Sequence, residues 1–258
     1  MFPDGAGKPK KGEMLVNPVI RRTNPLLWAL LLGGAITSTS AMAEVSGEIA
    51  VTNDYRFRGV SQTAGDFAVQ ASLDWSHDSG FFVGAWASNV EFDEDGTPKE
   101  DQVDADFELD VYLGYAGEIN DNLAYDITLL RYMYPGDNVS QDYNEISFGL
   151  EFSDFRAAYW YTNDYAGSDL DYHYAELNYS YEFAENWSLD LHLGYNFGDA
   201  PDDDMGKYLD YSIGVSTEIA GFGLSLAWLD TDIDSDAEIS SGTFQNDDTV
   251  LASVSYAF

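Results

Sequence analysis

The chain has 258 residues and a formal net charge of −35, which disfavours a nucleic-acid partner because phosphate binding needs clustered Lys and Arg. Its 18 Tyr, 15 Phe and 6 Trp offer ample apolar surface for burial and argue against intrinsic disorder. The absence of cysteine excludes disulfides and Cys-ligated zinc sites, so stability has to come from burial and backbone pairing.

Residues 1–43 have the three parts of a secretory signal peptide. Five of the eleven basic residues stand in this segment, an apolar run from Leu26 to Ile36 follows them, and Ala41-Met42-Ala43 supplies a cleavage site. A transmembrane helix needs about 20 apolar residues, and this run is far shorter. We expect a cleaved signal peptide, with Met14 as an alternative start, and a mature chain of residues 44–258 with a formal charge of −38.

Twelve segments of the mature chain alternate apolar with polar or small residues, which is the period of a β-strand and not of a helix. The clearest is 187–197, with Trp, Leu, Tyr and Phe at odd positions and Ser, Asp, His, Gly and Asn at even ones. Segments 81–92 and 222–231 are the least certain, so ten or fourteen strands stay open. The predicted strands are 46–58, 66–77, 81–92, 105–118, 122–133, 143–152, 155–164, 172–183, 187–197, 208–219, 222–231 and 249–258.

The connections between these strands alternate strictly in length. Short turns at 77–80, 119–121, 153–154, 184–186 and 220–221 alternate with longer, acidic connections at 59–65, 93–104, 134–142, 165–171, 198–207 and 232–248. A soluble β-sandwich also has alternating strands, but short turns on one side and long loops on the other are typical of membrane barrels. We therefore expect an all-β fold: a single antiparallel up-and-down transmembrane β-barrel of about 12 strands, surrounded by outer-membrane lipid in a bacterium.

Aromatic residues concentrate near both ends of the predicted strands, as expected for two interfacial girdles. Those near the short turns are Trp75, Phe81, Phe152, Phe155, Phe183, Trp187, Phe222 and Phe258. Those near the long loops are Tyr55, Phe57, Phe92, Tyr134, Tyr143, Tyr165, Tyr172, Phe197 and Tyr208. We expect both sets to face the lipid.

A distinctive motif lies near the mature N-terminus, where residues 52–63 read Thr-Asn-Asp-Tyr-Arg-Phe-Arg-Gly-Val-Ser-Gln-Thr. With the Trp-rich hairpin that follows, it resembles the TorF-type outer-membrane porin family, and the similarity extends over most of 44–258. The matching positions are Asp54, Tyr55, Phe57, Arg58, Gly59, Ser61, Gln62 and Thr63. The resemblance implies a bacterial outer-membrane barrel, with no catalytic residues and no assigned solute.

The last strand ends on two aromatic residues of the same parity, Tyr256 and Phe258. This ending is similar to that of outer-membrane barrel chains in general. The similarity implies that these two residues form an assembly signal, read by the barrel-assembly machinery.

Strand parity also predicts which charged residues line the lumen. Continuing the first strand to residue 58 places Tyr55 and Phe57 on the lipid side, with Asp54, Arg56 and Arg58 inside near the outer rim. The pore-lining candidates are Glu48, Asp54, Arg56, Arg58, Asp106, Glu108, Asp110, Arg156, Glu176, Asp190 and Asp210. On this parity 14 acids and 3 bases face inward, which favours cations. Alternatively, these charges simply pair with one another.

We therefore expect a porin-like channel for passive diffusion of ions or small polar solutes, with a bias toward cations. The alternative is a structural or surface-interaction barrel with a blocked lumen. Small lumen residues argue for open space: Gly114, Gly149, Gly194, Gly214, Ser147, Ser180, Ser212 and Ser216.

Neither catalysis nor a metal or cofactor site is expected. An outer-membrane hydrolase needs a serine activated by a histidine, but His77 falls in a turn, His173 faces lipid and His192 faces the lumen. The acidic segment 91–102 departs from the calcium-loop pattern at its first and last positions, which are Glu91 and Gln102.

Overall fold

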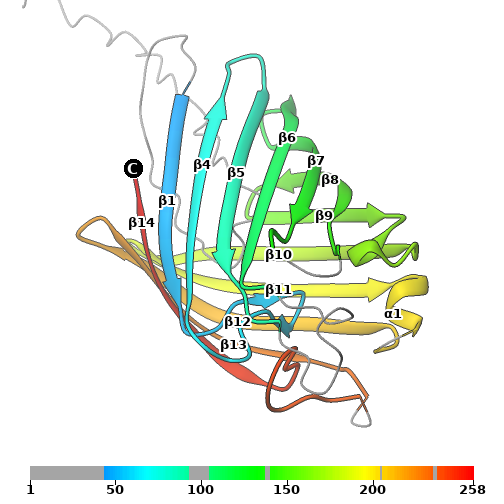
Figure 1. Cartoon of the computed structure of the whole chain (residues 1–258). Coiled ribbons are helices and arrows are strands. Elements are labelled where there is room, and N and C mark those ends of the chain that lie inside the picture. The colour runs from blue at the N-terminus through cyan, green and yellow to red at the C-terminus, as the bar shows by residue number, and fades with distance from the viewer. Residues whose placement is uncertain (1–43, 93–104, 137–139, 204, 235–236) are drawn as a thin grey trace, which may run out of the picture.

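The computed structural model describes residues 44–92, 105–136, 140–203, 205–234 and 237–258. The predicted signal peptide at 1–43 and the acidic loop 93–104 lie outside these residues. Twelve antiparallel strands form one closed barrel, in which each strand pairs with its neighbours along the chain and β1 pairs with β14 (Figure 1).

The barrel strands are β1 (Glu44–Thr52), β4 (Ala68–Ser76), β5 (Phe81–Asn89), β6 (Phe107–Asn120), β7 (Leu123–Met133), β8 (Tyr143–Phe152), β9 (Phe155–Thr162), β10 (Tyr172–Ala184), β11 (Trp187–Phe197), β12 (Tyr208–Ile219), β13 (Phe222–Thr231) and β14 (Thr249–Ala257). The loops carry three short elements and a small helix: β2 (Arg56–Phe57), β3 (Val60–Ser61), the 3-10 turn η2 (Tyr165–Gly167) and α1 (Asp199–Asp203). The predicted strand count is confirmed. The first strand is the main error in its bounds, because β1 ends at Thr52 and the chain then leaves the wall.

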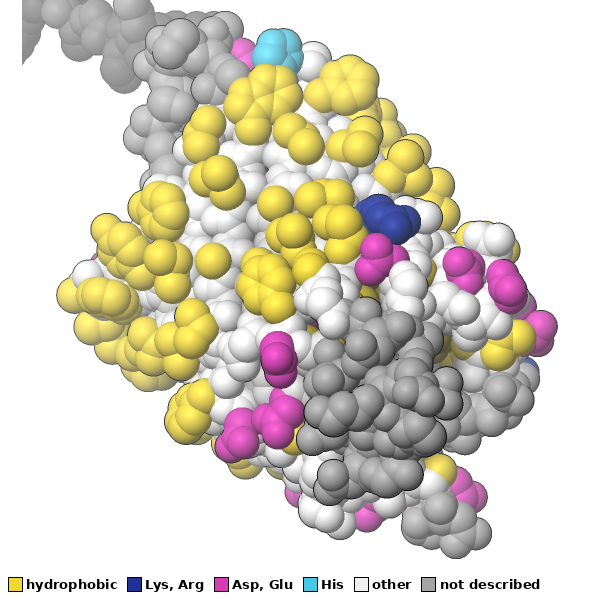
Figure 2. Space-filling model, in the orientation of Figure 1, with side chains coloured by type: hydrophobic (Ala, Val, Ile, Leu, Met, Phe, Trp, Pro, Cys, Tyr) yellow, Lys and Arg dark blue, Asp and Glu magenta, His cyan; other side chains and the backbone are white. Residues whose placement is uncertain are grey.

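The two faces of the wall follow the period-two pattern of the sequence. Apolar residues such as Leu193 and Val254 are exposed outward, whereas polar residues such as Asn178 and Asn196 are fully buried inside. Hydrophobic side chains cover a broad part of the outer face, and acids gather toward the loop end (Figure 2). This distribution is the reverse of a water-soluble protein and matches a wall that faces lipid. Among the described residues, no helix has the length and hydropathy of a membrane span.

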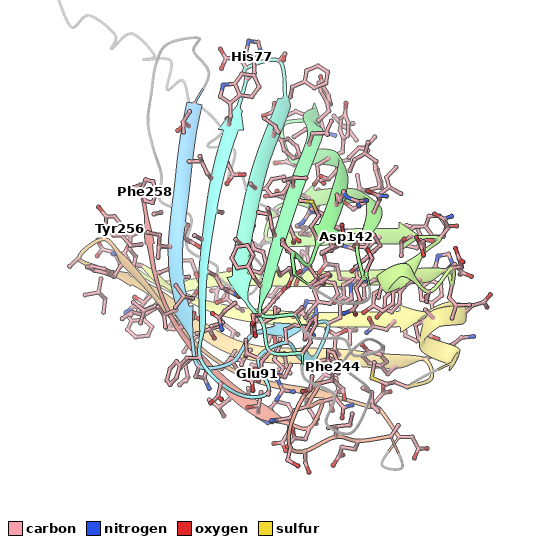
Figure 3. The ribbon with its side chains drawn as sticks, in the orientation of Figure 1. His77, Glu91, Asp142, Phe244, Tyr256 and Phe258 are labelled. Atoms are coloured by element: carbon pink, nitrogen blue, oxygen red, sulfur yellow. The ribbon has the colours of Figure 1, made fainter. Side chains whose placement is uncertain are left out.

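Short turns and long loops occupy opposite ends of the barrel, as predicted. His77 lies at the short-turn end, whereas Glu91 and Phe244 lie at the loop end (Figure 3). The turn between β12 and β13 shows why these connections are so tight: Ala220 and Gly221 have φ of 56° and 81°. Two positive φ values in a two-residue loop suit the right-handed twist of the strands on either side.

The prediction of two lipid-facing aromatic girdles is correct at the short-turn end only. There, Phe81, Phe152 and Trp187 are exposed on the outer face. At the loop end many of the predicted members are buried instead in two clusters inside the barrel. Tyr55, Phe92, Tyr143 and Tyr172 belong to the larger cluster, against which Phe57, Tyr134 and Tyr165 pack, and Tyr208 belongs to the smaller one. Two physical reasons account for this. Tyr143, Tyr172 and Tyr208 are the first residues of β8, β10 and β12 and occupy inward positions of the wall. Tyr55 and Phe57 lie on the segment after β1, which turns into the lumen.

The last residue of the chain extends the seam between β1 and β14. Gly47 and Phe258 exchange two backbone hydrogen bonds of 2.9 Å. The ring of Phe258 lies over Gly47, at a place where any side chain on residue 47 would collide with it and with the carbonyl of Ser72. The C-terminal aromatic therefore adds a backbone pair and a ring contact to the seam that five other residue pairs form. Its reading by the assembly machinery stays a prediction.

We expect Gly47→Val to weaken this seam, because the new side chain displaces the Phe258 ring. Overpacking of this kind costs about 1–3 kcal/mol. The measurement is the temperature at which the folded band disappears from a denaturing gel. Val45→Ala, which changes an outward residue on the same strand, should leave that temperature almost unchanged. Equal temperatures for Gly47→Val and the wild type would contradict the seam described here.

Candidate functional site

The segment after β1 folds into the lumen as a small hairpin. β2 and β3 pair through Arg56 with Ser61 and Phe57 with Val60, separately from the barrel sheet. Figure 1 shows these two short strands within the barrel, near its loop end. Tyr55 packs edge-on against Trp86 at 5.3 Å, and Phe57 packs against Tyr132 at 5.8 Å. The prediction that Tyr55 and Phe57 face the lipid is therefore wrong.

Asp54 organises the hairpin from within. Its Oδ1 accepts hydrogen bonds from Ser61 Oγ at 2.6 Å and Thr63 Oγ1 at 3.1 Å, and its Oδ2 accepts one from Arg56 Nε at 2.5 Å. Asp54 and Arg56 are both buried. A carboxylate that holds three donors fixes the hairpin in one conformation, since charge-assisted hydrogen bonds are stronger than neutral ones.

Arg56 also connects the hairpin to the last long loop. Its Nη1 donates to the carbonyl oxygen of Gln245 at 2.8 Å and to that of Asp247 at 3.2 Å. The Gln245 carbonyl accepts the backbone N–H of Ser61 as well, at 2.7 Å. The described part of loop 232–248 thus contacts the hairpin directly.

Arg58 fixes the tip of the hairpin to the opposite wall. Its Nη2 donates to both carboxylate oxygens of Glu145 on β8, at 2.7 and 2.9 Å. The guanidinium lies 4.6 Å from the ring centroid of Tyr174 and 4.9 Å from that of Tyr172. Because the Glu145 side chain is fully buried, this pair is shielded from water and salt.

The hairpin turn needs the residues found in the signature motif. Arg58 and Gly59 have φ of 51° and 89°, a conformation that costs little for glycine and more for arginine. A side chain on Gly59 would collide with Thr231 and Asp210 on the wall. Glycine therefore lets the turn reach β12 and β13, while Tyr208 donates to the Arg58 carbonyl at 3.1 Å.

The hairpin leaves a cavity of about 200 Å³ in the lumen. Of the predicted pore-lining residues, it brings together Asp54, Arg56, Arg58, Asp110, Glu176 and Asp210. Four aromatic residues of the barrel strands also line it, and none of them was among the predicted pore-lining residues: Trp86, Tyr132, Trp160 and Tyr174. Their positions on the inward face of the predicted strands could have identified them as lumen residues. That indication conflicted with the assumption that aromatic rings face the lipid.

The other predicted pore-lining residues lie elsewhere. Glu48 and Glu108 are buried inward but do not line this cavity. Asp190 lines a smaller cavity of about 60 Å³ and accepts hydrogen bonds from Ser180 and Ser216. Arg156 is buried in an ion pair with Asp126 at 2.8 Å. Asp106 is exposed and precedes β6, so its assignment to the pore lining is wrong.

The prediction that small lumen residues mark open space is correct only in part. Ser212 lines the larger cavity, and Gly214 and Ser216 line the smaller one, but large side chains cover three of the predicted glycines. The ring of Phe82 lies over Gly114, the guanidinium of Arg156 lies over Gly149, and the phenol of Tyr174 lies over Gly194. Each glycine therefore makes room for a large side chain from a neighbouring strand. The free volume of the lumen is set by these packed pairs and by the hairpin.

His192 belongs to a hydrogen-bonded network on the lumen wall. Its Nε2 lies 2.8 Å from Asp210 Oδ1, and its Nδ1 lies 2.6 Å from Asn178 Oδ1. Tyr174 and Asn196 donate to the two oxygens of Asp210 at 3.1 and 2.8 Å. With both ring nitrogens engaged by amide and carboxylate oxygens, the arrangement orients Asp210 at the cavity and shows no serine activated as a nucleophile among these contacts.

Comparison with known proteins places the chain in a sequence family. Residues 36–258 match the family described as "Bacterial protein of unknown function (Gcw_chp)". No curated protein matches the sequence. The match spans the whole barrel and includes the signature motif.

Solved structures with a similar fold are outer-membrane porins. The KdgM porin has a TM-score of 0.51 at 8% identity, over 84% of this chain and 99% of that one. A KdgM porin in complex with disordered oligogalacturonate has a TM-score of 0.48 at 9% identity, over 84% and 99%. The NanC porin has a TM-score of 0.48 at 9% identity, over 83% and 98%. At such low identity the likeness concerns the fold alone.

Proposed function

The chain belongs to this bacterial family of unknown function, and we propose that it is an outer-membrane channel for small polar solutes, with a preference for cations. The observation that carries the proposal is a closed twelve-stranded barrel with an apolar outer face and a charged lumen that holds a cavity. The porin fold of similar structures and the resemblance of residues 54–63 to TorF-type porins support it.

The lumen charges support the preference for cations. Three lumen arginines are bound to acids: Arg56 to Asp54, Arg58 to Glu145 and Arg156 to Asp126. Further acids, such as Asp110 and Glu176, line the cavity without an ion pair among the described residues. An excess of acids in a partly dehydrated passage raises the local concentration of cations and repels anions.

Conductance in a planar bilayer under a potassium chloride gradient tests the proposal. We expect a small single-channel conductance and a reversal potential on the cation side, with weaker selectivity at high salt because the Debye length shrinks to about 3 Å at 1 M. A reversal potential on the anion side would contradict the charge argument.

A structural barrel with a blocked lumen is the second candidate. The observation that favours it is the hairpin itself, because Arg56 and Arg58 fasten the segment inside the barrel. Protein that inserts into vesicles and shifts in mobility on boiling, but never conducts, would support this candidate over a channel. Enzymatic activity has no support in the contacts of His192 described above.

A further inference from the structure

Asp110 is a buried carboxylate that faces the cavity without a partner. Both of its carboxylate oxygens lack a hydrogen bond among the described residues, and the residue is only 1% exposed. It lies in the middle of β6 and lines the cavity of about 200 Å³. Burial of a charged group without a compensating contact is costly, so an unpartnered acid in such a place needs an explanation.

Two aromatic residues flank Asp110 in the same row of the wall. Its backbone partners are Trp86 on β5 and Tyr132 on β7, and all three side chains are buried toward the lumen. Directly paired residues of antiparallel strands have Cβ atoms about 4.5–5.5 Å apart. A cation bound to the carboxylate would therefore lie within reach of an indole and a phenol ring, and aromatic faces attract cations.

Acidic groups outnumber basic groups around Asp110. Glu108 is also buried and inward on the same strand, and its Oε2 lacks a partner among the described residues. The nearby base, Arg58, already donates to both oxygens of Glu145. One arginine therefore faces three carboxylates in this part of the lumen, which favours a bound cation from outside the chain.

We propose that the cavity at Asp110 binds a small organic cation with a primary ammonium group, held by the Asp110 carboxylate between Trp86 and Tyr132. The proposal deepens the channel function and rests on it for access to the site. The ligand has to be small, because pockets for drug-sized molecules measure about 300–1,000 Å³. An aliphatic ammonium ion fits the volume, the unpartnered oxygens and the two ring faces together.

Titration calorimetry of the folded barrel in detergent micelles, with ethylammonium chloride as the probe, tests this site. We expect saturable binding of ethylammonium, no binding of sodium propionate, and no displacement by an equal concentration of potassium chloride. Asp110→Asn keeps the size of the side chain and should weaken binding about tenfold to a hundredfold, since hydrogen bonds to charged groups contribute about 1.5–3 kcal/mol. Trp86→Leu should weaken it by a smaller factor.

Glu218→Gln is the matched control, because it neutralises an exposed acid on β12 that does not line the cavity. Its affinity should equal that of the wild type. Absence of saturable binding to the wild type would overturn the proposal without reference to any variant. Equal affinity of Asp110→Asn and wild type, or displacement by potassium, would overturn it as well. Binding of ethylammonium in micelles does not require the protein to conduct. If the protein bound ethylammonium but never conducted, the proposed channel function would be refuted and the binding site at Asp110 would still be supported.

Discussion

Replacing Arg58 by alanine is expected to lower the free energy of unfolding of the barrel by about 3–5 kcal/mol. The substitution leaves Glu145, whose side chain is fully buried, without its cation, and Tyr132 then provides its remaining hydrogen bond, at 2.9 Å. It also removes the guanidinium from the rings of Tyr172 and Tyr174. Unfolding in urea from lipid vesicles, followed by tryptophan fluorescence, measures the loss.

Arg131 offers a control, because it also forms an ion pair with a carboxylate but does so at an exposed position. Its ion pair with Asp142 spans 3.1 Å, but the two side chains are 43% and 29% exposed. Exposed pairs contribute about 0–1 kcal/mol, so Arg131→Ala should have a small effect. The double variant Arg58→Ala/Glu145→Ala should recover part of the lost stability, since no buried unpaired charge remains. Equal losses for Arg58→Ala and Arg131→Ala would show that burial of the first pair has no energetic consequence.

Removing the Asp54 carboxylate is expected to release the hairpin and raise the conductance well above that of the wild type. Asp54→Ala removes three hydrogen bonds that involve a charged group, each worth about 1.5–3 kcal/mol. Arg56 then loses its buried counter-ion, and the hydroxyls of Ser61 and Thr63 lose their shared acceptor. Single-channel recordings measure the opening, and trypsin should cut after Arg56 or Arg58, which are buried in the wild type.

Asp66→Ala provides the comparison within the same loop. Asp66 is exposed, and it contacts Thr63 through main-chain atoms that the substitution keeps. Conductance and trypsin resistance should therefore stay at wild-type levels. If Asp54→Ala behaved like Asp66→Ala in both measurements, the hairpin would not be the element that narrows the lumen. A silent wild type with a conducting Asp54→Ala variant would identify a barrel blocked by its hairpin.

The wall of the barrel could be predicted from the sequence because its determinants are local. Alternation places each side chain on one of two faces, and turns such as Ala220-Gly221 set strand ends within a few residues. The same parity correctly placed Asp110, Arg156 and His192 inside. The alternation of residues 250–258 was also sufficient to place Phe258 at the end of the last strand.

The contents of the lumen were decided by tertiary structure. Alternation continues smoothly past Thr52 to Arg58, so nothing local shows that β1 ends there and that Tyr55 and Phe57 turn inward. The reason for that turn lies in contacts between distant segments: Arg58 with Glu145, Arg56 with the carbonyl of Gln245, and Gly59 against the wall. A sequence specifies which residues can occupy a face, but the closed wall determines which partners they meet. The aromatic cluster and the cavity at Asp110 therefore arise only when the barrel closes around the hairpin.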